Sequence, residues 1–499
     1  MGAEPKPEPV PVPVRPAVVV LVPFPAQGHV SPMLRLARAL AAPGVVAATV
    51  AVPDFVHRRI VSASQAESAA GVALASIASG IPDDGDGEPP GFASILHAME
   101  HHMPAHLEGM LKTNQSLTGR GVAFLVLDVL ASWAVPVAIR CGVPAVGFWP
   151  AMLATYRVVA AIPELIDKGL ISDSGIPTAT KRLNNDETKV NGDLHKLPAE
   201  LELSTAELPW LVGDEACQKS RFTFWLRTME RARSLRSILV NTFPGEAASD
   251  SGEHLHPSQI PQVLQVGPLP TDSFDRTKGD SHHSPLRIPS MWQADDTCME
   301  WLDQQRPGTV TYVSFGSWVA PIGRDEIKEL ALGLEATGLP FLWALKDEPS
   351  WRGGLPSGYK ETVADRGKIV AWAPQEDVLQ HEAVGCYLTH CGWNSTLEAI
   401  QNGVRLLCCP LSSDQFINCA YIVKMWGIGI RLGSTKRSIV EDGIKRIMEG
   451  EEGRRLQEKV NEFRERVMTG EARCASKRNL ESFLGGIMRD DLVLGQLSL

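Results

Sequence analysis

The sequence predicts an α/β protein made of two doubly wound parallel-sheet domains, and three observations predict it. Short apolar runs alternate with longer amphipathic runs along most of the chain, which is the pattern of βα units. This rhythm stops in a polar stretch near residue 270 and then restarts. The chain has 499 residues, whereas a single core stops growing at roughly 250–300 residues.

The first domain is predicted over residues 17–269, after a disordered Pro-rich tail at 1–16. A helix with Pro32 near its start is predicted over 32–42. Residues 172–192 are polar and are predicted to form an inserted surface segment. Apolar runs predict strands at 18–24, 45–52, 124–128, 145–149 and 237–242.

Residues 270–290 are rich in Asp, Ser, His and Pro and are predicted to link the domains. The second domain is predicted over 291–480, and 481–499 is predicted to form an amphipathic helix. Because parallel sheets bind ligands at the carboxyl ends of their strands, we expect a cleft between the domains. The second set of predicted strands is 309–316, 341–346, 368–373, 386–390, 406–410 and 428–432.

Composition excludes several classes of protein. Hydrophobic residues make up 44% and charged residues 21%, which are values of a globular chain. The formal charge of −10 disfavours a nucleic-acid partner. The nine cysteines are scattered, which predicts a reducing compartment. The sequence shows neither a basic and apolar leader nor an apolar run of membrane-spanning length, so we expect a cytoplasmic protein without membrane attachment.

Two residues at predicted strand ends are candidates for proton transfer. His29 lies between the first strand and the first helix, where an imidazole can act as a general base near neutral pH. Asp128 ends an apolar run and could orient that imidazole. The alternatives are a loop histidine bonded to backbone and an aspartate that caps a helix.

Residues 372–415 hold the densest cluster of candidate binding residues. Gly392 predicts a tight turn, and the spacing of Ser395 and Glu398 predicts a capping box, so that a helix begins at Ser395. Its N-terminal amides would bind an anion, with His390 as a further donor. Trp372 could stack on a base, and Glu398 could bond a ribose diol. The alternative is a capped structural helix beside a buried tryptophan.

This 44-residue stretch resembles the signature box of plant family 1 UDP-glycosyltransferases, which have the GT-B fold. The resemblance extends over most of the chain. It includes the segments 25–29, 128–133, 241–243, 266–269 and 313–317.

The resemblance implies an inverting enzyme that moves glucose from UDP-glucose, as donor substrate, to a small hydroxylated hydrophobic acceptor. Flavonoids, phenolics, terpenoids and hormone-like molecules are the implied acceptors, and the product is a β-glucoside. No metal or other cofactor is expected, and the chain is expected to be a monomer. His29 would be the general base and Asp128 its partner. The C-terminal helix would pack back on the first domain.

The resemblance also implies the donor contacts. Trp372 and Ala373 would bind uracil, and Gln375 and Glu398 the ribose. The diphosphate would contact Ser317, His390, Asn394 and Ser395. The sugar hydroxyls would contact Trp393, Asp414 and Gln415, and Gln at this last position accompanies glucose more often than galactose.

Apolar residues of the first domain are predicted to line the acceptor pocket: Phe148, Trp149, Met152, Tyr156 and Trp210. The chain departs from the family pattern at Pro150, Arg405, Cys409, Leu411 and the segment 241–246.

Three metal patterns are weaker than their structural alternatives. Asp84 and Asp86 lie in a turn-forming loop. His97, His101, His102 and His106 have helical spacing but no second ligand cluster. Cys386, His390 and Cys391 cannot all point to one ion from a single strand.

Two other functions are considered. An NAD-dependent oxidoreductase is disfavoured because the glycine fingerprint is missing. The second is a catalytically inactive protein of the same fold that binds a sugar nucleotide.

Overall fold

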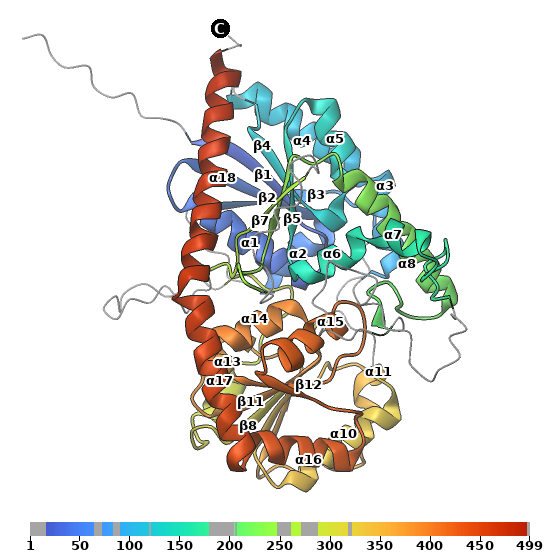
Figure 1. Cartoon of the computed structure of the whole chain (residues 1–499), viewed down its shortest axis with the longest axis vertical. Coiled ribbons are helices and arrows are strands. Elements are labelled where there is room, and N and C mark those ends of the chain that lie inside the picture. Colours follow the sequence, from blue (N-terminus) through green and yellow to red (C-terminus); the bar gives the residue numbers. More distant parts are fainter. Residues whose placement is uncertain are drawn as a thin grey trace, which may run out of the picture.

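The computed structural model describes residues 16–63, 72–82, 90–118, 121–178, 204, 207–246, 261–270, 288–317 and 322–496. It shows two parallel α/β domains, one above the other in Figure 1. Some predictions concern residues outside the described ranges. They are those for Asp84 and Asp86, for most of the 1–16 tail, for most of the 270–290 linker and for the later part of 172–192.

The first sheet has seven strands in the order β3-β2-β1-β4-β5-β6-β7, and every described pairing is parallel. Two of its strands were not predicted. They are the sheet's two edges, and their side chains are half exposed, so the apolar signal is weak. The strands are β1 (Ala17–Val22), β2 (Val46–Pro53), β3 (Val72–Ile77), β4 (Phe124–Asp128), β5 (Ala145–Trp149), β6 (Ser237–Val240) and β7 (Gln262–Gln265).

The helices of this domain cover both faces of the sheet (Figure 1). They are α1 (Gln27–Ala41), α2 (Asp54–Ala63), α3 (Phe92–His101), α4 (Met103–Thr118), η1 (Val129–Ala131), α5 (Ala134–Cys141), α6 (Leu153–Ala160), α7 (Ile162–Asp167) and α8 (Glu215–Ala232).

Helix α1 begins five residues earlier than predicted, at Gln27, so Pro32 lies inside it. A proline has no N–H to donate to the carbonyl four residues before it, here that of Gly28. That carbonyl instead accepts a hydrogen bond from Nδ2 of Asn394 in the second domain, at 2.6 Å. The proline therefore frees a backbone acceptor for a contact between the domains.

The second sheet has six strands in the order β10-β9-β8-β11-β12-β13, again parallel. All six were predicted, with ends that differ by a few residues. They are β8 (Val310–Ser314), β9 (Phe341–Ala344), β10 (Gly367–Val370), β11 (Val384–Thr389), β12 (Arg405–Cys408) and β13 (Gly429–Arg431).

Helices flank this sheet, and the last of them leaves the domain. They are α9 (Thr297–Leu302), α10 (Arg324–Thr337), α11 (Pro349–Arg352), α12 (Tyr359–Thr362), α13 (Gln375–Gln380), α14 (Trp393–Asn402), α15 (Gln415–Ala420), η3 (Tyr421–Met425), α16 (Arg437–Met448), α17 (Gly450–Met468) and α18 (Glu471–Gln496).

Helix α18 begins ten residues before the predicted boundary and runs along both domains (Figure 1). Arg473, Ser476 and Asn479 donate to the carbonyls of Pro268, Gly267 and Gln265, at the edge of the first sheet. Phe483 and Leu484 are buried in the core of the first domain. The helix therefore ties the second domain to the first.

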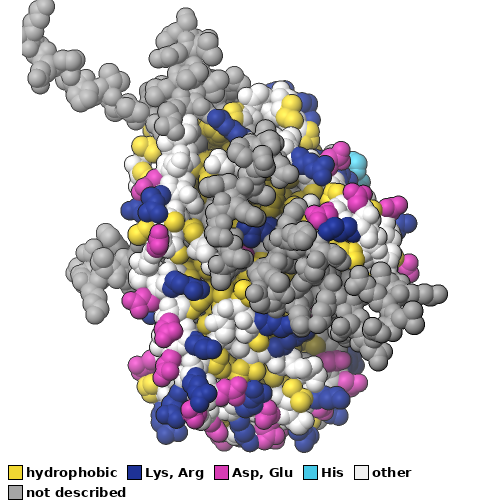
Figure 2. Space-filling model, viewed as in Figure 1, with side chains coloured by type: hydrophobic (Ala, Val, Ile, Leu, Met, Phe, Trp, Pro, Cys, Tyr) yellow, Lys and Arg dark blue, Asp and Glu magenta, His cyan; other side chains and the backbone are white. Residues whose placement is uncertain are grey.

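Charged side chains of both signs are interspersed over the second domain on the face in Figure 2. Within the described residues, no helix is both long and apolar enough to cross a bilayer.

Candidate active site

A cavity of about 1270 Å³ lies between the two domains. Its walls include the loops after β1 and β5 of the first domain and those after β8 and β11 of the second. All these loops follow the carboxyl ends of parallel strands, where the βα pattern predicts a ligand site.

His29 and Asp128 meet at this cavity. Nδ1 of His29 lies 2.7 Å from Oδ2 of Asp128, whose carboxylate is fully buried. Oδ1 of Asp128 also accepts the backbone N–H of Leu130, as a helix cap does. Asp128 therefore makes both hydrogen bonds that were considered for it, one to the imidazole of His29 and one that caps a helix. A carboxylate on Nδ1 favours the tautomer that leaves Nε2 as proton acceptor, and the His29 side chain is 24% exposed.

Helix α14 points its N-terminus at the same cavity. It begins at Trp393, with Gly392 as a cap that has no side-chain bond. The amides of a first helical turn have no partners within the helix, so they favour an anion. Gly392, Asn394 and Ser395 all line the cavity, as Ser317 does.

The capping box predicted at Ser395 and Glu398 is wrong. Because α14 begins two residues earlier, Glu398 lies in the second turn instead of at the cap. Its Oε1 accepts from Arg35 at 3.2 Å and its Oε2 from Nε2 of Gln375 at 2.7 Å. Gln375 also donates to Oγ of Ser395 at 3.0 Å. The two predicted ribose contacts thus lie side by side.

His390 is buried beneath the helix terminus and is 7% exposed. Burial lowers the pKa of its imidazole to about 4, so the ring is neutral at pH 7. Among the described residues its Nδ1 has no hydrogen-bond partner. Two glycines pack against the ring, because a Cβ on Gly316 or Gly392 would lie 2.6 or 2.4 Å from Nε2.

Trp372 and Ala373 line the cavity on the side of the second domain. The Trp372 ring lies 5.7 Å from that of Trp292, at an angle of 32°. Trp292 also lines the cavity, and the guanidinium of Arg59 lies 5.2 Å from its ring centroid. Sequence reasoning missed Trp292, which follows the linker with no motif around it.

The predicted sugar contacts also line the cavity. Asp414 is half-buried, desolvation raises the pKa of its carboxyl, and Asn418 donates to its Oδ2 at 2.9 Å. Gln415 uses its Oε1 to accept the N–H groups of Leu411 and Ser412. The indole of Trp393 donates to the carbonyl of Asn241 in the first domain, at 2.7 Å.

Two residues near this site have positive φ without being glycine: Cys391 at 66° and Ser413 at 60°. Such backbone costs on the order of 1–3 kcal/mol each and persists where the surroundings hold it. Each precedes residues predicted to contact the donor, so the strain lies in the loops that shape this wall.

Four of the five predicted acceptor residues do not line the cavity. Only Trp149 does. Phe148 precedes it on β5 and points to the opposite face of the sheet, since neighbours on a strand alternate. Met152 and Trp210 are fully buried, and Tyr156 packs edge-on against Trp149. The aromatic residues that line the first domain's part of the cavity are instead Phe24, Phe92, Trp149, Phe224 and Trp225.

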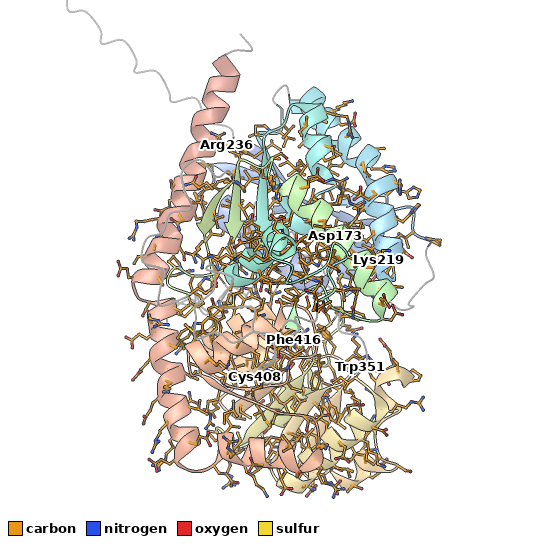
Figure 3. The ribbon with its side chains drawn as sticks, turned by 45° about the vertical axis from the view of Figure 1, so that its right-hand side comes forward. Asp173, Lys219, Arg236, Trp351, Cys408 and Phe416 are labelled. Atoms are coloured by element: carbon orange, nitrogen blue, oxygen red, sulfur yellow. The ribbon has the colours of Figure 1, made fainter. Side chains whose placement is uncertain are left out.

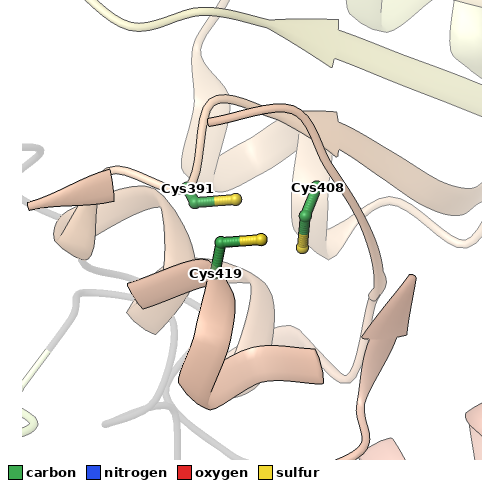
Figure 4. Close-up of side chains that lie close together, drawn as sticks. All are labelled: Cys391, Cys408 and Cys419. Atoms are coloured by element: carbon green, nitrogen blue, oxygen red, sulfur yellow. The ribbon is translucent and has the colours of Figure 1, made fainter. Parts of the chain in front are cut away.

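Three cysteines lie close together behind the donor side: Cys391, Cys408 and Cys419 (Figure 4). Their sulfurs are buried and lie within 4.8 Å of one another. Zinc takes four ligands, and no fourth ligand joins these three among the described residues. Cys386 instead lies against Thr311, so the set of Cys386, His390 and Cys391 is not assembled. The described histidines of α3 and α4 form no metal-ligating group of three.

Arg405, one of the departures from the family pattern, makes hydrogen bonds within the second domain. Arg405 is buried at the start of β12 and donates to the carbonyls of Gly385, Ile447 and Gly453. It does not line the cavity, whereas the departure at Pro150 does.

Comparison with known proteins identifies the family. Residues 294–454 match the family described as UDP-glucoronosyl and UDP-glucosyl transferase. The chain is 42% identical over 475 residues to UDP-glycosyltransferase 82A1 of Arabidopsis thaliana, covering 92% of this chain and 96% of that protein. The chain belongs to the plant family 1 UDP-glycosyltransferases.

Solved relatives of this UDP-glycosyltransferase have the same GT-B fold. Os79 of O. sativa, solved in complex with UDP, superposes with a TM-score of 0.75 at 26% identity, over 94% of this chain and all of that chain. By sequence, the chain is also 28% identical to the (R)-mandelonitrile beta-glucosyltransferase of Prunus dulcis, over 89% of this chain and 91% of that protein. The predictions of fold class, family and enzyme class are confirmed.

Proposed function

We propose that this UDP-glycosyltransferase moves glucose from UDP-glucose to the hydroxyl of a small hydrophobic acceptor, with inversion to a β-glucoside. The observation that carries the proposal is that His29, hydrogen-bonded to Asp128, opens on the same cavity as the N-terminus of α14. A base and an anion site therefore face one space. UDP in the solved structure of Os79 supports a UDP donor.

Each side chain then has one task. Nε2 of His29 takes the proton of the acceptor hydroxyl as its oxygen bonds to the anomeric carbon. Asp128 stabilises the imidazolium that forms. The bond from the anomeric carbon to the diphosphate breaks, and the departing charge lies at the first turn of α14 and at Ser317. Such fixed donors are commonly the largest catalytic effect, and we propose that they act without a metal ion.

Glucose is the proposed sugar. Gln415 stands where relatives of this family have glutamine with glucose more often than with galactose, and its amide is held in place by two backbone N–H groups. We further propose that the chain acts as a monomer, because all the residues named above come from one chain.

The test incubates the purified protein with UDP-glucose and phenolic, terpenoid and carboxylic acceptors, and identifies products by mass spectrometry. We expect β-glucosides from the wild type and a loss of about a hundredfold or more in His29→Ala. His101→Gln is the control, because this imidazole is exposed at the far end of α3. Calorimetric titration of UDP-glucose is run on all three proteins.

The outcomes separate the alternatives. Donor binding in every protein without transfer to any acceptor would support the catalytically inactive alternative. Equal transfer by wild type and His29→Ala would contradict the role of His29. Absence of UDP-glucose binding would contradict the donor site.

A further inference from the structure

One part of the first domain's wall of the cavity is mostly apolar and has a cation at one end. We call this part the aromatic lobe. Aromatic and aliphatic side chains of the first domain make its walls, and Arg221 on α8 is the cation among them. The lobe consists of Phe24, Phe92, Leu130, Trp149, Val212, Arg221, Phe224 and Trp225.

The rings of the lobe form a continuous row from His29 to Arg221. The Phe24 ring lies 5.2 Å from the His29 ring, and the Phe224 ring lies 6.5 Å from Phe24. Phe92 meets Phe224 edge-on at 5.7 Å. The guanidinium of Arg221 then lies 4.4 Å from the Phe92 centroid. The base and the guanidinium thus stand at opposite ends of the row.

Arg221 has no carboxylate beside it among the described residues. Its electrostatic neighbour is Cys217, and its partial burial lowers the pKa of the guanidinium. The carboxylates that line the cavity, Glu376, Asp377, Glu398 and Asp414, all belong to the second domain. A half-buried cation on an apolar wall is costly unless an anion accompanies it. Among the described residues no carboxylate accompanies Arg221, and in this cavity a ligand can supply one.

We propose that the acceptor is a rigid hydroxylated carboxylic acid, aromatic or terpenoid, whose carboxylate binds Arg221 while its hydroxyl reaches His29. The inference rests on the proposed function and narrows its acceptor class. A guanidinium binds a carboxylate through two parallel hydrogen bonds, and the rings between Arg221 and His29 offer apolar contacts to the body of the acceptor.

The proposal fixes which bond forms. With the carboxylate at Arg221, the hydroxyl oxygen bonds to the anomeric carbon and its proton goes to Nε2 of His29. The bond between the anomeric carbon and the diphosphate breaks, and UDP leaves. The product is an O-glucoside of the hydroxyl group with a free carboxylate, and not a glucose ester.

The experiment compares hydroxy acids with their methyl esters. Acceptors are hydroxycinnamic acids, hydroxybiphenyl carboxylic acids and hydroxylated diterpenoid acids, each with its ester. For wild type we expect kcat/KM to be roughly ten- to a hundredfold higher for the preferred acid than for its ester, as a charge-assisted hydrogen bond supplies. In Arg221→Met this preference disappears, because kcat/KM for the acid falls to that for its ester. Arg221→Lys keeps part of the preference for the acid, because lysine keeps the positive charge but cannot make the two parallel hydrogen bonds of a guanidinium.

Lys219→Met is the matched control. It removes a cation from the same helix, but Lys219 is exposed and does not line the cavity (labelled in Figure 3). We expect Lys219→Met to keep the wild-type ratio of kcat/KM for the acid to kcat/KM for its ester. Alkaline treatment of the products checks the bond, because an ester glucoside is hydrolysed and an ether glucoside survives.

A binding measurement separates this inference from the proposed function. Quenching of tryptophan fluorescence gives the Kd of each acid and ester, with or without transfer. A Kd for the acid that weakens about tenfold in Arg221→Met, and not in Lys219→Met, supports the acid site even if no glucose is transferred. Equal affinity of acid and ester in wild type, equal losses for both in Arg221→Met, or alkali-labile products would each overturn the proposal.

Discussion

At the scale of single residues, the wall of the cavity at His390 depends on two glycines that leave room for its imidazole ring. Gly316 follows β8 with a φ of 79°, and a Cβ there would overlap the imidazole at 2.6 Å from Nε2. Real Cβ atoms do not approach so closely, and the buried ring has no room to retreat. The turn after β8 therefore helps to fix the position of a predicted diphosphate contact.

We expect Gly316→Ala to weaken UDP binding by about tenfold or more, which calorimetric titration measures. Gly338→Ala is the control. Gly338 has a similar φ of 68° but nothing within 4 Å of its added methyl group, so it isolates the backbone cost. That cost, about 1–2 kcal/mol, lowers stability without changing UDP affinity. UDP affinity at the wild-type level in Gly316→Ala would show that the ring position does not matter.

At the scale of elements, Glu246 holds the start of α6 from a loop ninety residues away. Its buried carboxylate accepts the N–H groups of Leu153 and Ala154 and the hydroxyl of Thr242. Burial raises the pKa of the carboxyl to about 7. The folded value lies above the unfolded one, so protonation adds stability that is complete below about pH 4.5 and lost as pH rises through 7.

We therefore expect Glu246→Gln to remove pH dependence of the free energy of unfolding between pH 4.5 and 7. Urea unfolding at several pH values measures it, and the wild type should be less stable relative to the variant at pH 7.5 than at pH 5. A constant difference across this range would contradict the raised pKa.

Arg405 acts on three elements at once, because it links the start of β12 to the strand β11, to the end of α16 and to the start of α17. Its guanidinium donates to the backbone carbonyls of Gly385, Ile447 and Gly453, and Arg405 is 8% exposed. Arg405→Met leaves buried carbonyls without donors, at about 1–3 kcal/mol for each such group. We expect a loss of about 2–4 kcal/mol in urea unfolding and unchanged UDP affinity. A weaker UDP affinity at full folding would show that Arg405 acts on the donor site.

The accuracy of the sequence predictions follows from how each element is buried. Central strands are continuous apolar runs, so β4 and β5 were predicted to the residue. The half-exposed edge strands β3 and β7 carry no such run and were missed. The starts of α1 and α14 were predicted too late, and tertiary contacts lie near both. Gly28 bonds to Asn394 at α1, and Glu398 bonds to Arg35 and Gln375 at α14.

The residues predicted to contact the donor all line the cavity, and all but Ser317 lie in one short stretch of the chain, 372–415. The acceptor residues come from separate loops, and their direction depends on strand register. Phe148 and Trp149 are adjacent in sequence, yet only Trp149 reaches the cavity. Arg221 and Phe224 lie on α8 without a motif, so only the fold brings them to the cavity that His29 also lines.

At the scale of the whole molecule, one buried cation links the two domains beside the cavity. Arg35 on α1 contacts Glu376 on α13 and Glu398 on α14, and its side chain is 6% exposed. The side chains of Asn394, Trp393 and Trp426 cross the same interface to backbone carbonyls. Since Glu398 is also a predicted ribose contact, the approach of the domains and the shape of the donor site depend on one ion cluster.

We expect Arg35→Met to lower the free energy of unfolding by about 3 kcal/mol or more, because two carboxylates remain without their shared counter-ion. Arg446→Met is the control. It breaks an ion pair with Glu452 whose side chains are 48% and 47% exposed, which is worth at most about 1 kcal/mol. Differential scanning calorimetry compares the transition temperatures. The double variant Arg35→Met with Glu376→Gln should recover part of the loss, because it leaves one carboxylate instead of two. Equal effects of Arg35→Met and Arg446→Met would mean that the ion cluster does not hold the domains together.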